Sequence, residues 1–158
     1  MGVKFAAALG AEVTVFSHSH EKESDAIQMG ATHFVLTRDP EVFRNLKNSF
    51  HVILNTVAAD INLDPYINSL PLDGTLVMIG LPGKPYSLRA DLLLPARRSI
   101  AGSMIGGVPE LQEMLDFCAE HNITSDVEVI SANEINNAYK RTVASDVKYR
   151  FVIDAKTF

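Results

Sequence analysis

The chain has 158 residues, of which 47% are hydrophobic and 21% are charged, as expected for a globular protein with a buried core. Fourteen Lys and Arg residues against 19 Asp and Glu residues give a net charge of −5, which argues against binding of nucleic acid or an anionic membrane through a basic face. No apolar run approaches the about 20 residues of a membrane-spanning helix, and no segment resembles a secretory leader. The single cysteine, Cys118, excludes an internal disulfide and a cysteine-based zinc site made by this chain alone. We therefore expect a cytoplasmic protein.

Short apolar strands alternate with helices over the first hundred residues. Residues 1–9 are rich in alanine, with apolar residues at helical spacing, and predict a helix that ends at Gly10. A β-branched run at 12–16 predicts a strand, and a charged helix follows at 21–29. Further strands are expected at 33–36, 50–54, 74–79 and 99–104, and further helices at 40–46 and 61–70. This alternation indicates βαβ units in a parallel sheet, and the nearly continuous apolar strands indicate that both faces of the sheet are covered.

The pattern changes after about Gly107. Pro109 suits the first turn of a new helix, and alternating apolar residues predict short strands around 127–130 and 149–153. Between these strands, residues 131–134 fit a capping box that opens another helix. The residues expected on the inner face of that helix are Ile135, Ala138 and Tyr139. We interpret this tail as part of a second layer and not as more of the doubly wound sheet.

A dinucleotide site in such a sheet needs a strand, a glycine-rich turn and a helix, in that order. The glycines let the backbone approach the pyrophosphate, and the helix N-terminus supplies unpaired N–H groups. Here the sequence opens directly in the first helix, and Gly2 alone is not a fingerprint. The residues by themselves therefore give nucleotide binding only partial support.

Five separated motifs occur in order along the whole chain. They are MGVKFA at 1–6, NTVAA at 55–59, AGSMIGG at 101–107, EMLDFC at 113–118 and DVKYRFVID at 146–154. Together they resemble the zinc-dependent medium-chain alcohol dehydrogenases, and in particular the cinnamyl-alcohol-dehydrogenase-like branch that includes bacterial NADPH-dependent aldehyde reductases. In that family, a glycine-rich loop and a His immediately precede the Met-Gly-x-Lys helix.

The resemblance implies an α/β fold, namely a Rossmann-like doubly wound parallel sheet that lacks its first strand and its glycine-rich loop. It divides the chain into an NADP(H)-binding domain at 1–106, incomplete at its N-terminus, and a C-terminal α+β tail at 107–158 that returns to a GroES-like catalytic domain. Because the strand order of such sheets is 3-2-1-4-5-6, loss of the first strand is expected to leave unpaired backbone groups on both sides of a central gap.

The end of the strand at 12–16 carries residues suited to a phosphate group. NAD enzymes usually place Asp or Glu there for the ribose hydroxyls, and a carboxylate would repel a 2′-phosphate. This chain instead has Ser17, His18 and Ser19, with Lys22 just beyond, and hydroxyl donors with a cation suit a phosphate dianion. By resemblance, Ser17, Ser19 and Lys22 match 2′-phosphate contacts, whereas His18 and His20 depart from the family pattern. The alternative is a solvated polar loop.

By resemblance, the remaining cofactor contacts follow later strands. They are Thr56, Val57, Gly80, Leu81, Ser103, Met104 and Ile105. Met104 and Ile105 would also face the substrate, as an apolar wall suited to an aldehyde with a hydrophobic or aromatic tail. Arg150 matches a family position near the pyrophosphate, and its alternative is an exposed cation on an edge strand.

Metal ligation has little support in the residues. His18-x-His20 and Cys118-x-x-His121 have short spacings, but zinc needs three or four convergent ligands, and Cys118 is expected in the core on a helix face shared with Leu115. By resemblance, the catalytic zinc ligands and the hydroxyl relay lie upstream of the glycine-rich loop. No catalytic residue and no metal ligand are therefore expected in this chain, and zinc only in the full-length enzyme.

The expected function is the cofactor-binding half of an NADPH-dependent, zinc-dependent alcohol dehydrogenase or aldehyde reductase, which interconverts alcohol and NADP⁺ with aldehyde and NADPH. The expected partners are a small-molecule alcohol or aldehyde and, as usual in the family, a second copy in a homodimer. The chain alone should be inactive and should bind NADPH weakly. The alternatives are a truncated, inactive or domain-swapping fragment and a non-catalytic Rossmann-like binding or methyltransferase module.

Overall fold

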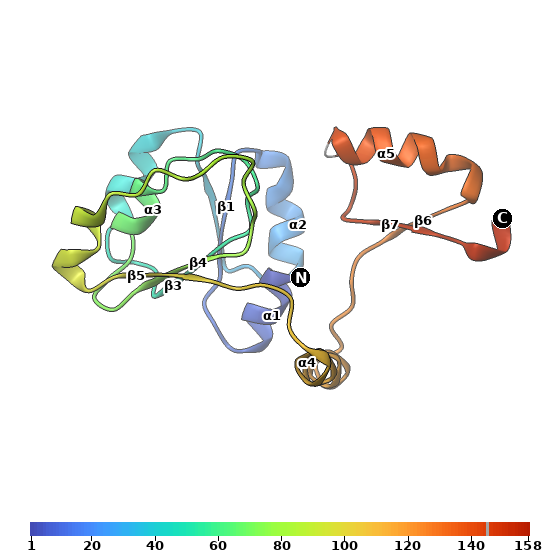
Figure 1. The fold of residues 1–158 in the computed structure, drawn as a ribbon, viewed down its shortest axis with the longest axis horizontal. Helices are drawn as coiled ribbons and strands as arrows, with labels where there is room; N and C mark the ends of the chain where they lie inside the picture. The colour runs from blue at the N-terminus through green and yellow to red at the C-terminus, as the bar shows by residue number, and fades with distance from the viewer. Residues whose placement is uncertain (145) are drawn as a thin grey trace. The chain divides into compact units, whose positions relative to one another are not determined.

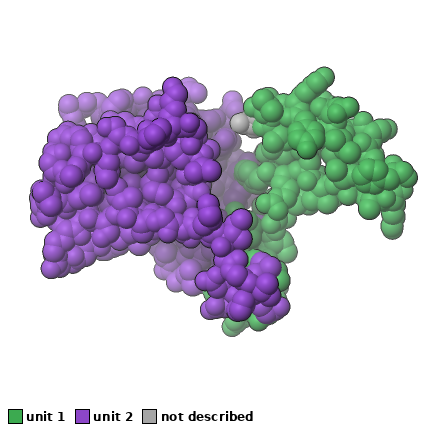
Figure 2. Space-filling model, in the orientation of Figure 1, with its two compact units in different colours: residues 1, 114–158 green, residues 2–113 purple. Residues whose placement is uncertain are grey.

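The computed structural model describes residues 1–144 and 146–158, which form two compact units (Figures 1 and 2). The larger unit comprises Gly2–Glu113, and the smaller unit comprises Met1 with Met114–Phe158. Their boundary falls within helix α4 (Val108–Glu120). None of the helices in the described residues has the length and hydrophobicity to cross a membrane.

The strands of the larger unit form two parallel sheets within the fully described stretch 2–113. In the first sheet, β1 (Thr14–Ser17) pairs with β2 (His33–Leu36). In the second sheet, β4 (Thr75–Met78) lies between β3 (Val52–Asn55) and β5 (Ser99–Gly102). Within that stretch no ladder joins β1 to β3. The prediction of a parallel α/β sheet interrupted at its centre is therefore confirmed.

The helices of the larger unit differ from the sequence predictions in length and type. The charged helix begins as a 3₁₀ turn, η1 (His20–Lys22), and continues as α2 (Glu23–Gln28). The segment predicted as a helix at 40–46 is a 3₁₀ helix, η2 (Pro40–Asn45). The helix predicted at 61–70 is shortened to α3 (Asp64–Asn68), because Pro65, which has no N–H group, occupies its first turn. The other elements are α1 (Gly2–Ala8), η3 (Ala90–Leu92) and η4 (Leu94–Ala96).

The core of the larger unit lies between α3 and the second sheet. Its buried residues are Ile53, Leu63, Ile67, Leu70 and Leu76. Along β3, the side chains of Ile53 and Asn55 are buried, whereas the alternate residues Val52 and Leu54 are 59% and 47% exposed. The prediction that both faces of the strands are covered is therefore wrong for β3. The reason is that β3 borders the gap and the core cluster packs against one of its faces only.

A cluster of aromatic rings links β1 to η2, to α3 and to the segment that precedes β3. Phe16 on β1 lies 5.2 Å from Phe50 and 5.5 Å from Tyr66, centroid to centroid, both edge to face. It also stacks on Phe43 at 5.7 Å, and Phe43 contacts Tyr66 at 4.9 Å. Burial raises the pKa of Tyr66, whose hydroxyl is hydrogen-bonded to Thr37. The cluster thus joins β1 to α3 by side-chain packing where no backbone ladder exists.

The smaller unit combines a parallel strand pair with a helix. β6 (Glu128–Ile130) pairs with β7 (Phe151–Ile153), and α5 (Ile135–Val143) follows η5 (Ala132–Glu134). The predicted capping box is confirmed, because the Ser131 N–H donates to Glu134 Oε2 at 2.9 Å and the Ser131 side chain accepts from the Glu134 backbone N–H. Ala138 is buried as expected, but Tyr139 is 69% exposed. Tyr139 lines the same depression as Ile135 and Ala138, as expected for this face, but the depression is open and leaves the ring exposed. The last element is η6 (Ala155–Thr157).

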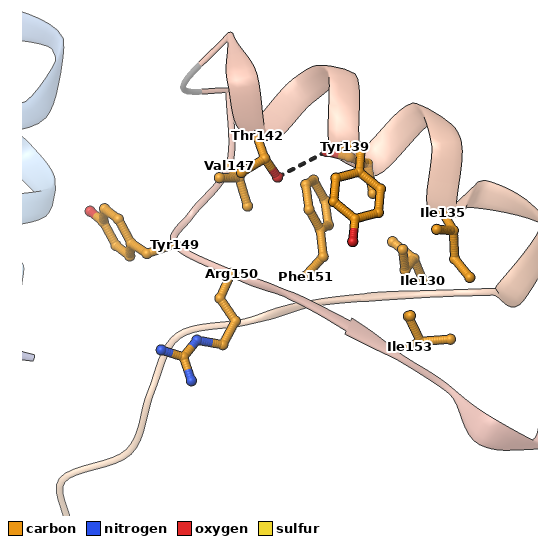
Figure 3. A pocket seen from close by; sticks show the side chains of 10 residues that line it. Ile130, Ile135, Tyr139, Thr142, Val147, Tyr149, Arg150, Phe151 and Ile153 are labelled. Carbon is orange, nitrogen blue, oxygen red and sulfur yellow. Dashed lines mark hydrogen bonds between the residues drawn. The ribbon is translucent and has the colours of Figure 1, made fainter. Parts of the chain in front are cut away.

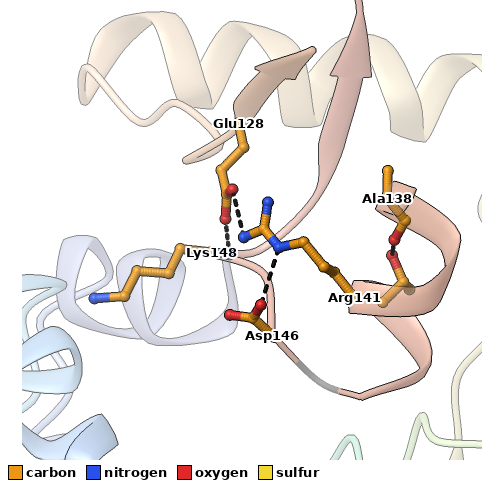
Figure 4. A network of polar contacts seen from close by, with 6 residues as sticks. Glu128, Ala138, Arg141, Asp146 and Lys148 are labelled. Atoms are coloured by element: carbon orange, nitrogen blue, oxygen red, sulfur yellow. Dashed lines mark hydrogen bonds and ion pairs between the residues drawn. The ribbon is translucent and has the colours of Figure 1, made fainter. Parts of the chain in front are cut away.

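A charged network ties α5 to the strands of the smaller unit (Figure 4). The Arg141 guanidinium donates to Glu128 Oε2 at 2.8 Å and to Asp146 Oδ2 at 2.9 Å. Its carbon lies 4.8 Å from the centre of the Phe151 ring. The Lys148 N–H donates to the other Glu128 oxygen at 2.8 Å, and this contact and Arg141 lower the pKa of Glu128.

Candidate functional site

The carboxyl end of β1 forms a tight polar turn. The Ser19 N–H donates to Ser17 Oγ at 3.1 Å, and the Ser17 hydroxyl donates to the Ser19 carbonyl at 3.2 Å. Short-range bonds of this kind are typical of serine in turns. Both serines are half-buried, and the turn fixes the Ser17 hydroxyl group at the end of the strand.

The end of β2 supports this turn. The Thr37 N–H donates to the Ser17 carbonyl at 2.9 Å, and Thr37 Oγ1 lies 3.3 Å from both that carbonyl and His18 Nδ1. The next residue, Arg38, is exposed. The sequence analysis did not name Arg38. The signal that could have found it is a cation two residues after the end of β2, the strand that pairs with β1.

Charge around the turn favours an anion. His20 Nδ1 lies 2.8 Å from Glu23 Oε2, and Glu21 and Glu23, which flank Lys22 in the sequence, weaken the local positive field. Lys22 and Arg38 are exposed, and within the described residues neither forms an ion pair. No Asp or Glu occupies 17–20. Hydroxyl groups with uncompensated cations fit a phosphate group and do not fit the bare ribose hydroxyls that a carboxylate would bind.

The carboxyl ends of β3 and β4 bring three predicted cofactor residues together. The Ile79 and Gly80 N–H groups both donate to the Asn55 carbonyl at 2.9 Å. A Cβ atom on Gly80 would lie 2.3 Å from the Val57 carbonyl oxygen, so only glycine fits there. Thr56, Val57 and Gly80 are thus adjacent, whereas Leu81 is 79% exposed beyond them.

The carboxyl end of β5 continues the same edge of the second sheet. The Ser103 N–H donates to the Met78 carbonyl at 3.1 Å, which extends the ladder by one residue. Met104 and Ile105 are then 86% and 96% exposed, and their role as a substrate wall stays a prediction. All these segments lie at the carboxyl ends of parallel strands, where open α/β sheets bind their ligands.

Arg150 belongs to the smaller unit. It immediately precedes β7, and its carbonyl accepts the Glu128 N–H at 2.9 Å. It borders an apolar depression of about 410 Å³, lined also by Ile135, Tyr139 and Phe151 (Figure 3). In Figure 3 its guanidinium points away from these side chains. The predicted role of Arg150 near the pyrophosphate stays a prediction.

The short His and Cys spacings do not assemble a metal site. Cys118 is half-buried, and its Sγ lies 3.6 Å from Met114 Sδ. His121 stacks on Phe117 with ring centroids 4.0 Å apart. Across residues 1–144 and 146–158, no three His, Cys, Asp or Glu side chains converge as metal ligands. The side chains described do not fit zinc, and no chemical step is assigned to a metal here.

Comparison with known proteins identifies similar chains. The model of a family described as zinc-binding dehydrogenase matches residues 1–120. The chain is 53% identical over 154 residues to NADP-dependent alcohol dehydrogenase C of Mycobacterium tuberculosis, and the match covers 98% of this chain and 44% of that protein. It is 50% identical over 158 residues to aldehyde reductase YahK of Escherichia coli, and this match covers 99% of this chain and 45% of that protein.

Solved structures give the same result. A cinnamyl alcohol dehydrogenase from Sorghum bicolor superposes with a TM-score of 0.93 at 37% identity, over 98% of this chain and 44% of that one. The CAD from Helicobacter pylori, complexed with NADP(H), superposes with a TM-score of 0.85 at 36% identity, over 99% of this chain and 44% of that one. The chain thus spans somewhat less than half the length of these relatives and matches their C-terminal, Rossmann-like half.

Proposed function

Because the chain belongs to the zinc-binding dehydrogenase family, we propose that it is the NADP(H)-binding half of an enzyme that interconverts an alcohol and an aldehyde. The relatives' names support this, since they include an NADP-dependent alcohol dehydrogenase and an aldehyde reductase. The observation that supports the proposal is the end of β1, where Ser17, Ser19 and Lys22 offer hydroxyl groups and a cation. No Asp or Glu occupies 17–20, although Glu21 and Glu23 flank Lys22.

In this proposal, the β1 turn selects the cofactor by its 2′-phosphate. The Ser19 hydroxyl donates to a phosphate oxygen, and the Ser17 hydroxyl does so once it releases the Ser19 carbonyl. Lys22 supplies the opposite charge. His18 borders the same turn, and Arg38 follows Thr37, whose side chain contacts that turn. An NADH ribose would gain neither the charge pairing nor the charge-assisted hydrogen bonds.

The ends of β3, β4 and β5 receive the rest of the cofactor. Thr56 and Val57, with Gly80 and Leu81, lie along its riboses. The absence of a Gly80 side chain lets the Val57 backbone pack against the end of β4. The backbone of 103–105 holds the nicotinamide carboxamide, and Met104 and Ile105 present an apolar wall to the substrate. When bound, NADP(H) itself carries the hydride.

The proposal leaves the metal-dependent part of the reaction to residues outside this chain. It treats 1–106 as the cofactor-binding domain and 107–158, with Arg150 near the pyrophosphate, as the segment that returns to the catalytic domain. The small alcohol or aldehyde substrate, the cytoplasmic location and the homodimer are further parts of the proposal, and they rest on the family resemblance.

Replacement of Lys22 tests the proposal. We expect Lys22→Glu to weaken NADPH binding about tenfold or more while leaving NADH binding nearly unchanged, because each charged hydrogen bond contributes about 1.5–3 kcal/mol. Binding is measured by NMR titration, which reports weak affinities. The matched control is Lys47→Glu, an equal charge change at another exposed lysine. Equal losses for NADPH and NADH in Lys22→Glu would contradict the assignment.

A further inference from the structure

A tyrosine hydroxyl holds the loop that follows β3. Tyr86 Oη lies 3.3 Å from the Val57 carbonyl oxygen and 3.2 Å from the Ala59 carbonyl oxygen, so one O–H group is shared between two acceptors. These acceptors belong to the loop 56–59, whereas Tyr86 lies in the segment after β4. The Tyr86 ring is half-buried and packs against the core cluster of the larger unit. The hydroxyl group is thus anchored on the core and restrains the loop from one side.

Two further residues restrain the same loop. The Asn55 side chain is buried, and its Oδ1 accepts the Val57 N–H at 3.0 Å. On the β4 side, Gly80 packs so closely that the Val57 carbonyl carbon would lie 2.6 Å from a Cβ atom placed there. The backbone of Val57 is therefore held at its N–H by Asn55 and at its carbonyl by Tyr86.

The side chains of this loop are left free. Thr56 and Val57 are exposed, although their backbone is tied to β4 and to Tyr86. Exposed side chains on an immobilised loop are the arrangement expected of a preorganised binding segment, because the ligand does not have to order the loop.

We propose that Tyr86, together with Asn55 and Gly80, is a positioning residue that presets the loop 56–59 for the cofactor. The identity of the ligand rests on the proposed function, but the restraint of the loop does not. The sequence analysis did not name Tyr86, and it included Asn55 only as part of the motif at 55–59. Tyr86 acts through the loop and touches no reacting atom.

Tyr86→Phe removes the hydroxyl group and keeps the packed ring. A net hydrogen bond of ordinary strength corresponds to about a three- to tenfold change in an equilibrium constant. We expect amide hydrogen exchange at Val57, whose N–H donates to Asn55 Oδ1, to accelerate by that factor, while the melting temperature changes little. The affinity for NADPH should fall by at least twofold, because only the ordered loop binds. The fall should not exceed the factor by which exchange accelerates. The 2′-phosphate preference, which depends on β1, should not change.

Tyr139→Phe is the matched control, because Tyr139 is an exposed tyrosine of the smaller unit. Unchanged exchange of the loop in Tyr86→Phe would overturn the positioning role and leave the proposed function intact. A loosened loop with unchanged NADPH affinity would overturn the link to the cofactor. If the unmodified chain bound no NADPH even at millimolar concentration, the proposed function and the link between the loop and the cofactor would both be overturned. The hydrogen-exchange measurement on Tyr86→Phe would still test whether Tyr86 restrains the loop.

Discussion

Phe16 is the central ring of the aromatic cluster that links β1 to η2, to α3 and to the segment that precedes β3. It contacts Phe43, Phe50 and Tyr66, with centroid distances of 5.2–5.7 Å. No backbone ladder joins β1 to β3 in the fully described stretch 2–113, so the usual hydrogen bonds of a continuous sheet cannot compensate for lost packing. Phe16→Leu keeps an apolar side chain of similar size and removes all three ring pairs.

The expected loss of stability follows from these pairs. Each aromatic pair of this geometry contributes about 0.5–1.5 kcal/mol beyond buried area, and neighbouring pairs are not additive. We therefore expect Phe16→Leu to lower the free energy of unfolding by about 2 kcal/mol. The assay is urea denaturation followed by near-ultraviolet circular dichroism, which reports the aromatic environment directly because the chain has no tryptophan.

Phe34→Leu is the matched control. Phe34 is a half-buried ring on the neighbouring strand β2, and within the described residues it makes no ring contact. Phe34→Leu should lower the free energy of unfolding by less than about 1 kcal/mol. Equal destabilisation by the two substitutions would refute the idea that the ring cluster joins β1 to α3.

Further predictions concern the core and the smaller unit. Leu76→Ala should lower the free energy of unfolding, measured by urea denaturation, by about 2–5 kcal/mol, because Leu76 is 1% exposed. The control Leu81→Ala, at a site that is 79% exposed, should change that free energy by no more than about 0.5 kcal/mol. Arg141→Gln should move the pKa of Glu128, followed by NMR, up toward the ordinary carboxyl value. Because the native pKa of Glu128 is lowered, its stabilising effect is full above the ordinary pKa of a glutamate and is lost as pH falls through the lowered value. An unchanged Glu128 titration in Arg141→Gln would contradict the network.

Local patterns in the sequence predicted most of the strands. The run at 33–36 matches β2 residue for residue, since β-branched and aromatic residues there are bounded by polar ones. The capping box at 131–134 was equally local. The strand order of doubly wound sheets also predicted the gap between β1 and β3.

The features that sequence reasoning missed depend on contacts between distant segments. Tyr86 meets the carbonyls of Val57 and Ala59 across 29 and 27 residues, and no local pattern signals such a contact. The exposure of Val52 was missed because an apolar run shows a strand but does not show which of its faces a helix covers. For the candidate site, the sequence predicted the polar end of β1, whereas the support from Thr37 became visible only in the fold.

The central claim is that this chain recognises the 2′-phosphate of NADP(H). The most direct measurement is an NMR chemical-shift titration of the isotope-labelled chain with 2′,5′-ADP and, separately, with 5′-AMP, which lacks the 2′-phosphate. Our account predicts larger shifts and tighter binding for 2′,5′-ADP, with the largest shifts at Ser17, Ser19 and Lys22. Equal binding of the two nucleotides, or shifts that avoid the end of β1, would contradict it.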